Sequence, residues 1–353
     1  MKQSLSFFIA LILFVFLMIR PAIAEETTID VKARTSDTLT LYLENDFFAK
    51  TDRYYTSGIK ISWISRDLSK YREIEAIPNR VHEYIERIPL INNAEQQRSV
   101  SLSFGQNIYT PEDKDNQDLI EDDRPYAGIT YLGLGLHSRS SQHMDTLELD
   151  VGIIGPHSYA EEIQKDIHRW NGSRYPRGWK HQLKDEPILN LFFERKWKVV
   201  QWISDSGQGF DWIPHTGVAL GNAYTGVNMG GQVRFGWNIP NDFGTYLIRP
   251  GSESSAPLND KDPRFLGLFH SFGLHFFFAV DGKAVLRNIM LDGNTFRDSH
   301  SVEKEPFVAD LIGGVGIMIY RVKITYSYVY QTKEFKRQRD EQSFGAIALS
   351  FTF

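Results

Sequence analysis

The stretch TLELDVGI, Thr146 to Ile153, decides the fold class of this chain. Its residues alternate, so that Leu147 and Leu149 fall on one face of an extended strand and Glu148 and Asp150 on the other. Carboxylates on one face imply water there, while the opposite face is uniformly apolar. The stretch therefore predicts a β-strand that separates water from apolar surroundings.

The same alternation recurs along the chain and predicts about twelve strands. The expected strands cover residues 37–46, 55–66, 99–108, 129–137, 146–153, 186–202, 209–222, 226–238, 266–284, 305–319, 321–332 and 342–353. Strands of soluble sheets are usually five or six residues long, whereas a strand of about ten residues crosses a bilayer at a tilt. An even number of such strands predicts an all-β fold, a transmembrane antiparallel β-barrel.

The composition agrees with an exported barrel and argues against a nucleic-acid-binding protein. The sequence contains 16 Tyr, 24 Phe and 7 Trp beside 27 Gly, a mixture typical of barrels in which only alternate residues face lipid. It contains no cysteine, so an exported chain of this composition relies on sources of stability other than disulfides. A formal net charge of −5 argues against nucleic acid as a partner, because that function needs a concentrated basic face.

The N-terminus predicts export from the cytoplasm. An apolar run from Phe7 to Ile19 follows Lys2, and Ala22 and Ala24 form the small-residue pattern of a cleavage site. The run is too short to span a bilayer comfortably, which favours a cleaved signal over an uncleaved anchor. Residues 1–24 are therefore expected to be a signal peptide. Residues 25–353, which contain no dividing linker, are expected to form one barrel domain.

The last strand, FGAIALSFTF from Phe344 to Phe353, ends the chain on an aromatic residue. This ending resembles the C-terminal assembly signal of bacterial outer-membrane barrels. The resemblance implies an outer-membrane, multi-pass barrel that meets the barrel assembly machinery during biogenesis and is then surrounded by membrane lipid. An ordinary terminal strand of a secreted β-sandwich is the alternative.

Long polar connections are expected on the cell-exterior side of a barrel. They cover residues 67–97, 109–126, 155–185, 241–263 and 287–304. From a periplasmic N-terminus the first strand runs outward, so the tip at residues 45–56 is expected at the outer mouth. By the same reasoning the 67–97 connection is periplasmic, although it is long for that side.

One of these connections predicts a short extracellular helix. Ser158 to Glu161 match the capping box, in which the serine caps the helix and the glutamate reaches back to it. Ile163, Ile167 and Trp170 then fall on one apolar face. We expect this face to pack on the barrel rim.

Gln164 and His168 lie four residues apart on that helix and are expected along the seam between helix and wall. An imidazole is well suited to removing a proton from water near neutral pH, which makes His168 a candidate base. Gln164 could orient the histidine or a substrate. The alternatives are a surface histidine and a solvated glutamine.

Asn45 and Asp46 end the first strand with a carboxamide and a carboxylate. These are hard oxygen ligands, suited to Ca²⁺ rather than to zinc. The alternative is an Asx turn, which both residue types commonly make. Thr56 faces the pair across the hairpin, where it could hold substrate or a catalytic water, or only pair across strands.

Arg124 begins a later strand and could grip a phosphate with two hydrogen bonds, and Lys114 in the preceding loop could also bind one. Exposed salt bridges are the alternative for both residues.

Six short motifs resemble, in order and approximate spacing, those of the outer-membrane lipid A 3′-O-deacylases. They are Asn45-Asp46, Tyr55-Thr56-x-Gly58, Gln106-x-Ile108-Tyr109-x-Pro111, Asp123-Arg124, Gly152-x-Ile154-Gly155-Pro156 and Gln164-x-x-x-His168-Arg169. The agreement runs from Leu41 to about Trp179, and the later strands agree more loosely.

This resemblance implies a twelve-stranded barrel with an active site between the outer rim and a loop helix. It also implies calcium-dependent release of the 3′-linked acyloxyacyl chain of lipid A, the membrane anchor of lipopolysaccharide. On this chain His168 becomes the base that activates water, and Asp46 and Asn45 hold the calcium. Thr56 and Gln164 complete the site.

The substrate-binding part departs from the family pattern. Where the family has a basic pair before Asp123-Arg124, this loop is acidic and carries only Lys114. Arg124, Lys114 and Tyr175 are the expected substrate contacts. An acidic residue expected shortly after the helix is missing between Gly172 and Tyr175.

Two rival functions remain. An outer-membrane phospholipase would need a serine and a histidine close together on one strand, and no histidine here has that context. A porin-like barrel would have an open, charged lumen. The Gly, Ser and Thr content of the predicted inner faces fits a narrow, filled barrel better.

Overall fold

The computed structural model describes residues 36–49, 54–68, 70–74, 79–92, 96–172, 175–245, 247–251, 253–259, 262–266 and 271–353. The expected signal peptide, residues 1–24, lies outside this range.

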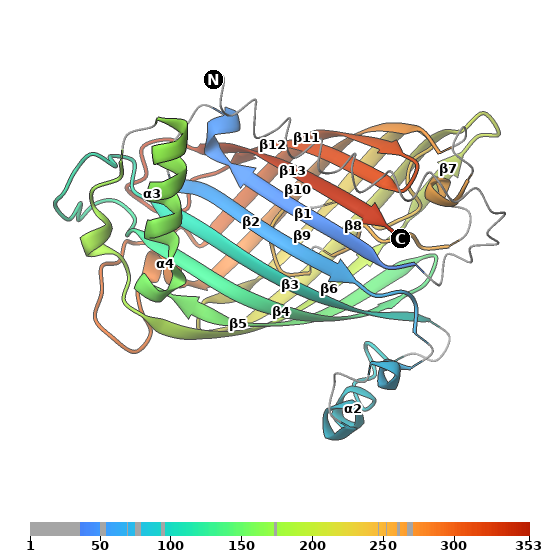
Figure 1. Cartoon of the computed structure of the whole chain (residues 1–353), viewed down its shortest axis with the longest axis horizontal. Coiled ribbons are helices and arrows are strands. Elements are labelled where there is room, and N and C mark those ends of the chain that lie inside the picture. The colour runs from blue at the N-terminus through green and yellow to red at the C-terminus, as the bar shows by residue number, and fades with distance from the viewer. Residues whose placement is uncertain are drawn as a thin grey trace.

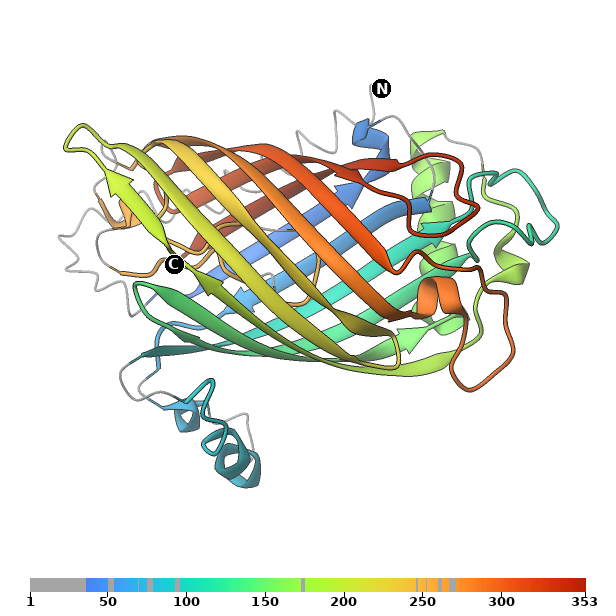
Figure 2. The same cartoon turned by 180° about the vertical axis from the view of Figure 1, so that it is seen from behind.

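Twelve long strands and one short strand form a single closed antiparallel sheet, which confirms the predicted barrel (Figures 1 and 2). The long strands are β1 (Thr38–Asn45), β2 (Tyr54–Ile64), β3 (Gln97–Thr110), β4 (Ala127–Arg139), β5 (His143–Ile154), β6 (Glu186–Trp197), β8 (Gln208–Gly221), β9 (Tyr224–Trp237), β10 (Gly273–Asn288), β11 (Phe307–Ile319), β12 (Val322–Gln331) and β13 (Gln342–Thr352). Each pairs with its neighbour in sequence, β1 pairs with β13, and pairing of β6 with β8 closes the ring.

The predicted strand bounds differ from the structure by more than three residues in two strands. The stretch 186–202 forms β6 and a separate short strand, β7 (Val200–Ile203), which pairs with the first part of β8. The strand expected over 266–284 is β10, Gly273–Asn288, because the chain up to Leu266 belongs to the connection described below.

The outside of the barrel is apolar and the inside is polar. Leu102, Phe104 and Leu132 point outward and are half exposed, whereas Ser101 and Ser103 point inward and are buried. A continuous apolar outer belt is what a membrane barrel presents to lipid. No helix of the described residues has the length and apolar character needed to cross a bilayer.

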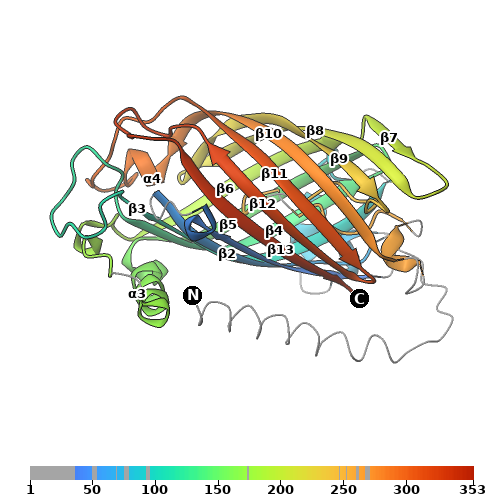
Figure 3. The same ribbon diagram turned by 90° about the horizontal axis from the view of Figure 1, so that it is seen from above.

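The helices form two groups, one toward each end of the barrel (Figures 1 and 3). At one end, called the α3 end, are α3 (Ala160–Asn171), α4 (Ile289–Asp292), η2 (Asp46–Ala49), η4 (Pro156–Ser158) and η5 (Trp179–His181). At the other end, called the α2 end, are α2 (Asn79–Ile85), η3 (Tyr71–Glu73) and η6 (Pro263–Phe265). β1 runs toward the α3 end, so the tip with Asn45 and Asp46 lies there.

The described residues of the connection between β9 and β10 lie inside the lumen. The connection leaves β9 at the α2 end, so the expectation that residues 241–263 form an exterior loop is wrong. Its carboxylate Asp242 accepts hydrogen bonds from Arg234 (2.5 Å), Lys323 (2.6 Å) and Arg264 (3.2 Å). All four side chains are at most 1 % exposed.

Charged residues of the inner wall hold this luminal connection. Lys60 of β2 pairs with Glu253 at 2.6 Å, and the backbone N–H of Ile248 donates to Glu44 of β1 at 2.6 Å. Buried charges are stable only with partners, and here the wall and the connection supply them to each other. The occupied lumen argues against the open channel of a porin.

Candidate active site

One row of residues crosses four strands near the α3 end. The register places Asn45 opposite Ser57, Ser57 opposite Ile108, and Ile108 opposite Gly128. Neighbouring strands are about 4.8 Å apart, so the row covers roughly 15 Å of the wall. Side chains alternate between faces along a strand, and Ile108 shares its face with the outward Phe104. The row therefore lies on the outside of the barrel.

Thr56 joins this outer row through a bulge. The β2–β3 register shifts between Tyr55 and Ser57, so Thr56 is an extra residue in β2. Its hydroxyl hydrogen-bonds that of Thr110 at 2.8 Å, and it is 4 % exposed. A bulge redirects a side chain, which here turns Thr56 toward the face that carries Thr110. Cross-strand pairing, one of the roles considered for Thr56, is therefore observed.

α3 is seated on the outer wall at its N-terminus. Gln106 of β3 and Thr130 of β4 both donate to the carbonyl of Ser158, at 2.7 and 2.8 Å. Gly128 lies directly beneath Ala160, and a Cβ at Gly128 would be 2.0 Å from the Ala160 Cβ. From this seat α3 crosses the outside of the wall toward β1 and η2 (Figure 1). The C-terminal half of α3 is therefore the part nearer Asn45 and Asp46.

The apolar face of α3 does not pack on the wall as predicted. Ile163 and Ile167 are 40 % and 42 % exposed, whereas Gln164 and His168 are 2 % and 6 % exposed. The surroundings of the two helix faces explain this orientation. The wall beneath the helix offers polar partners, and the outside of a membrane barrel accepts apolar side chains. The expected burial of Gln164 and His168 in the seam is observed, although the apolar face does not pack there; the side chain of Trp170 is outside the described residues.

The predicted capping box is also wrong. The N-cap residue of α3 is Tyr159, which has a left-handed backbone (φ 57°) and makes no side-chain cap. Ser158 instead ends η4, and its hydroxyl donates to the carbonyl of Gly155 at 2.6 Å. The sharp turn that places the helix on the wall replaces a regular cap.

Gln164 is fixed by a residue that the sequence analysis did not single out. Its Oε1 accepts a hydrogen bond from Trp179 Nε1 at 2.8 Å, and Trp179 packs against Tyr126 with ring centroids 5.0 Å apart. The Gln164 Nε2 has no hydrogen-bond partner within the part of the chain that the structure describes. A buried amide donor is thus held in the seam, one helical turn before His168.

Asn45 and Asp46 begin the turn at the end of β1. Asn45 Oδ1 accepts from the backbone N–H of Phe47 at 2.8 Å, so the Asx turn considered above is present. Asp46 is 1 % exposed and starts η2. A buried carboxylate beside a carboxamide fits a hard cation such as Ca²⁺, which also accepts backbone and water oxygens as ligands. Among the described residues no three His, Asp or Glu side chains gather as a metal site.

Arg124 lies on the luminal side of the rim. Its Nη1 donates to Glu334 at 2.8 Å, and its guanidinium stacks over Tyr109, 4.6 Å from the ring centroid. It is fully buried. Asp123 accepts from the backbone N–H groups of Glu112 and Arg124, and burial raises the pKa of Asp123. The ion pair of Arg124 is therefore buried, unlike the exposed salt bridge considered above, and its role as a phosphate contact stays a prediction.

Lys114 and Tyr175 belong to two loops that meet at the rim. The carbonyl of Lys114 accepts from the N–H of Arg177 at 2.8 Å. Tyr175 is 44 % exposed. Their loops are joined close to α3, and both residues remain predictions as substrate contacts.

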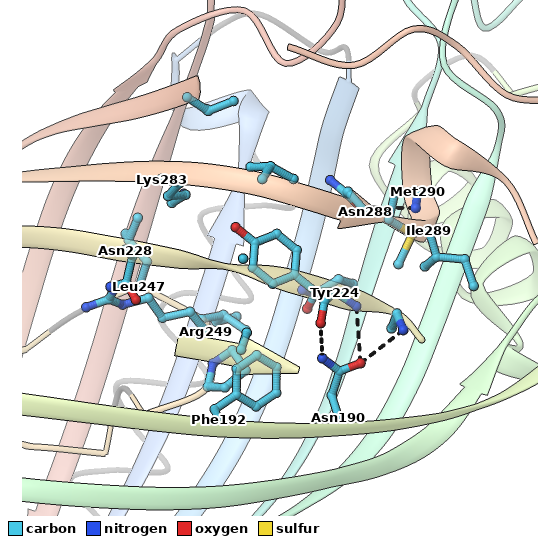
Figure 4. A pocket seen from close by; sticks show the side chains of 18 of the residues that line it. Asn190, Phe192, Tyr224, Asn228, Leu247, Arg249, Lys283, Asn288, Ile289 and Met290 are labelled. Carbon is cyan, nitrogen blue, oxygen red and sulfur yellow. Dashed lines mark hydrogen bonds between the residues drawn. The ribbon is translucent and has the colours of Figure 1, made fainter. Parts of the chain in front are cut away.

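A cavity of about 280 Å³ lies inside the barrel, on the other side of the wall from this row (Figure 4). Tyr224, Arg249 and Lys283 line it, with α4 at one side and the tip of the luminal connection at the other. Glu44 and Tyr55 also line the cavity and precede Asn45 and Thr56 in sequence. The cavity is lined by residues of the same four strands, β1 to β4, but from their inner face, so the cavity and the outer row lie on opposite sides of the wall.

The chain resembles known proteins over most of its length. The family model described as "Outer membrane protein LpxR" matches residues 9–353. A search of curated proteins found no match. Among solved structures, LpxR from Salmonella typhimurium is similar with a TM-score of 0.70 and 18% identity, covering 90% of this chain and 100% of that chain. The β domain of the Bordetella autotransporter BrkA has a TM-score of 0.41 and 9% identity, covering 90% of this chain and 99% of that chain.

Proposed function

The chain belongs to the LpxR family of outer membrane proteins, and we propose that it hydrolyses an ester bond of lipid A. It is a multi-pass β-barrel of the outer membrane. The proposed reaction is the calcium-dependent removal of the 3′-O-linked acyloxyacyl group. One observation carries the proposal. Gln164 and His168 are buried between α3 and the outer wall, at the end of the barrel where Asn45, Asp46 and Thr56 lie.

His168 is the proposed general base. Its imidazole takes a proton from water, and the water oxygen attacks the ester carbonyl carbon. When the bond to the sugar 3′-oxygen breaks, the same proton passes to that oxygen, so the products are a carboxylic acid and a sugar hydroxyl. One water molecule is consumed for each ester bond, and no further reactant is needed.

Gln164 and Thr56 are proposed to position the reactants. The Gln164 Nε2 supplies a buried donor for an ester oxygen, and Trp179 fixes its orientation. Thr56 places a hydroxyl on the same outer face. Bound Ca²⁺ would supply positive charge that stabilises the oxyanion of ester hydrolysis. Asp46 and Asn45 are the residues that would hold it.

The position of the site supports a lipid substrate. The seam beneath α3 lies on the outside of the barrel, just beyond the apolar rows of Phe104 and Leu132. An acylated lipid of the surrounding membrane reaches this place without passing through the lumen. A water-soluble ester has no comparable reason to be bound on the lipid side of the wall.

Mass spectrometry of lipid A tests this function. Purified protein in detergent micelles, incubated with purified lipid A and Ca²⁺, is expected to reduce the lipid mass by one acyloxyacyl group. A calcium chelator is expected to abolish the change, and excess Ca²⁺ to restore it. Release of fatty acid from added phospholipid with lipid A unchanged would contradict the proposal and indicate a phospholipase.

The close packing of α3 on Gly128 provides a second test of the proposed function. Gly128→Ala is expected to push Ala160 and α3 off the wall, since the new Cβ meets the Ala160 Cβ at 2.0 Å. A displacement of about 1 Å can reduce a reaction rate roughly 100-fold, so lipid A deacylation should fall strongly. Gly313→Ala is the matched control, because a Cβ there meets nothing within 4 Å. Equal activity of the two variants, both folded, would show that the position of α3 is unimportant.

A further inference from the structure

The segment between β2 and β3 builds a small helical unit on the outside of the barrel at the α2 end. We call residues 70–74 and 79–92 the side unit; it contains η3 and α2. Tyr71, Ile85 and Ile91 form its apolar centre, which packs on Val100 and Leu136 of the outer wall. The Tyr71 hydroxyl also bonds the wall, by donating to the carbonyl of His137 at 2.9 Å.

The side unit lies beside the barrel rather than beyond its end. In both side views α2 lies below the wall that contains β3 and β4, and within the length of the barrel (Figures 1 and 2). In an outer-membrane barrel, the space beside the wall near one end is occupied by lipid of one leaflet.

The apolar belt is shorter over β3 than over β10. On β3 the uncovered apolar residues are Leu102 and Phe104, because Val100 is covered by the side unit (2 % exposed) and Gln106 bonds the segment that leads into α3. On β10 exposed apolar residues run from Phe276 to Leu286.

The two lengths can be compared with a bilayer. With a rise of about 3.4 Å per residue and a tilt of about 40°, the β10 row covers roughly 26 Å, close to the ~25 Å apolar band of such barrels. The β3 row covers only about 5 Å. The rest of the band beside β3 must therefore contact the structures that cover the wall.

The side unit exposes three large apolar side chains where the belt is short, beside the exposed charges of Arg80, Glu83 and Arg87. Val81, Tyr84 and Leu90 are 41 %, 69 % and 48 % exposed. Val81 and Tyr84 are three residues apart and so share one face of α2. A tyrosine is typical of the boundary between lipid tails and head groups.

We propose that the side unit is seated in the membrane leaflet at the α2 end, with Val81, Tyr84 and Leu90 in contact with phospholipid. It extends the apolar belt where β3 is covered and holds the barrel at a fixed depth. The proposal rests on the outer-membrane location of the barrel and not on the hydrolase function, so either can fail alone.

Spin labels on single cysteines test the proposal, because the natural chain has no cysteine to interfere. Tyr84→Cys and its exposed neighbour Glu83→Cys are compared in the full-length protein in phospholipid vesicles. Leu102→Cys in the belt is the lipid reference. Asp118→Cys, whose native side chain is 91 % exposed, is the water reference.

The label at position 84 is expected to resemble the lipid reference. Molecular oxygen should relax it efficiently, and a water-soluble nickel complex should reach it several-fold less than the label at 83. Nickel accessibility at 84 equal to the water reference would overturn the proposal by placing the side unit in water. Low accessibility to both reagents would overturn it in favour of a protein partner.

Discussion

His168→Ala is expected to reduce lipid A deacylation by about 10² to 10⁴-fold, the usual contribution of a positioned general base. His168 is 6 % exposed, in the seam between α3 and the wall, so bulk water cannot easily replace it as the proton acceptor. The barrel should remain folded, because the strands pair independently of this side chain. Mass spectrometry of lipid A over time gives the rate.

His157→Ala is the matched control for this experiment. His157 belongs to the same connection, but its ring is mostly exposed and pairs with Asp185 at 2.6 Å. This variant should retain nearly full activity. Unchanged activity of His168→Ala would contradict the proposed mechanism. Equal losses of activity in both variants would indicate that the loop as a whole is disturbed.

Asp242→Ala is expected to cause the largest loss of stability. The substitution leaves the buried cations Arg234, Arg264 and Lys323 without a shared carboxylate. Arg234 retains Asp211, but the lumen gains uncompensated positive charge. Removing one partner of a buried ion pair costs about 3–5 kcal/mol. Urea unfolding of the protein in lipid vesicles measures the free energy of unfolding.

Two further variants separate charge from other effects. Asp118→Ala removes an exposed acid and should change the free energy of unfolding by less than about 0.5 kcal/mol. Adding Lys323→Met to Asp242→Ala removes one of the unpaired cations and should recover part of the loss. If Asp242→Ala unfolds like the natural chain, the ion cluster does not hold the luminal connection in place.

Most of the barrel could be predicted because alternation is a local property. In TLELDVGI the faces of Leu149 and Asp150 follow from the geometry of any extended chain, whatever its neighbours. The same reasoning places twelve strands with small errors. Pairing of β6 with β8 depends instead on where a strand breaks, and no local pattern marked the break before Val200.

The candidate site was only partly predictable. Asn45, Asp46, Thr56, Gln164 and His168 were identified from motifs, and the structure brings them to one end and one outer face. The role of Gly128 was not predictable, since a glycine beneath a helix resembles any other glycine of a strand. The buried ion pair of Arg124 was not predictable either, because its partner Glu334 is 210 residues away in sequence.

The sequence by itself determined the barrel, the number of long strands and the helix at Ala160, because each depends on periodicity within a short stretch. Only the tertiary structure decided which face of that helix meets the wall and where residues 241–263 lie. Periodicity defines two faces but not their surroundings. In this barrel the outside is apolar and the lumen is charged, so Ile163 turns away from the wall and Asp242 turns into the interior.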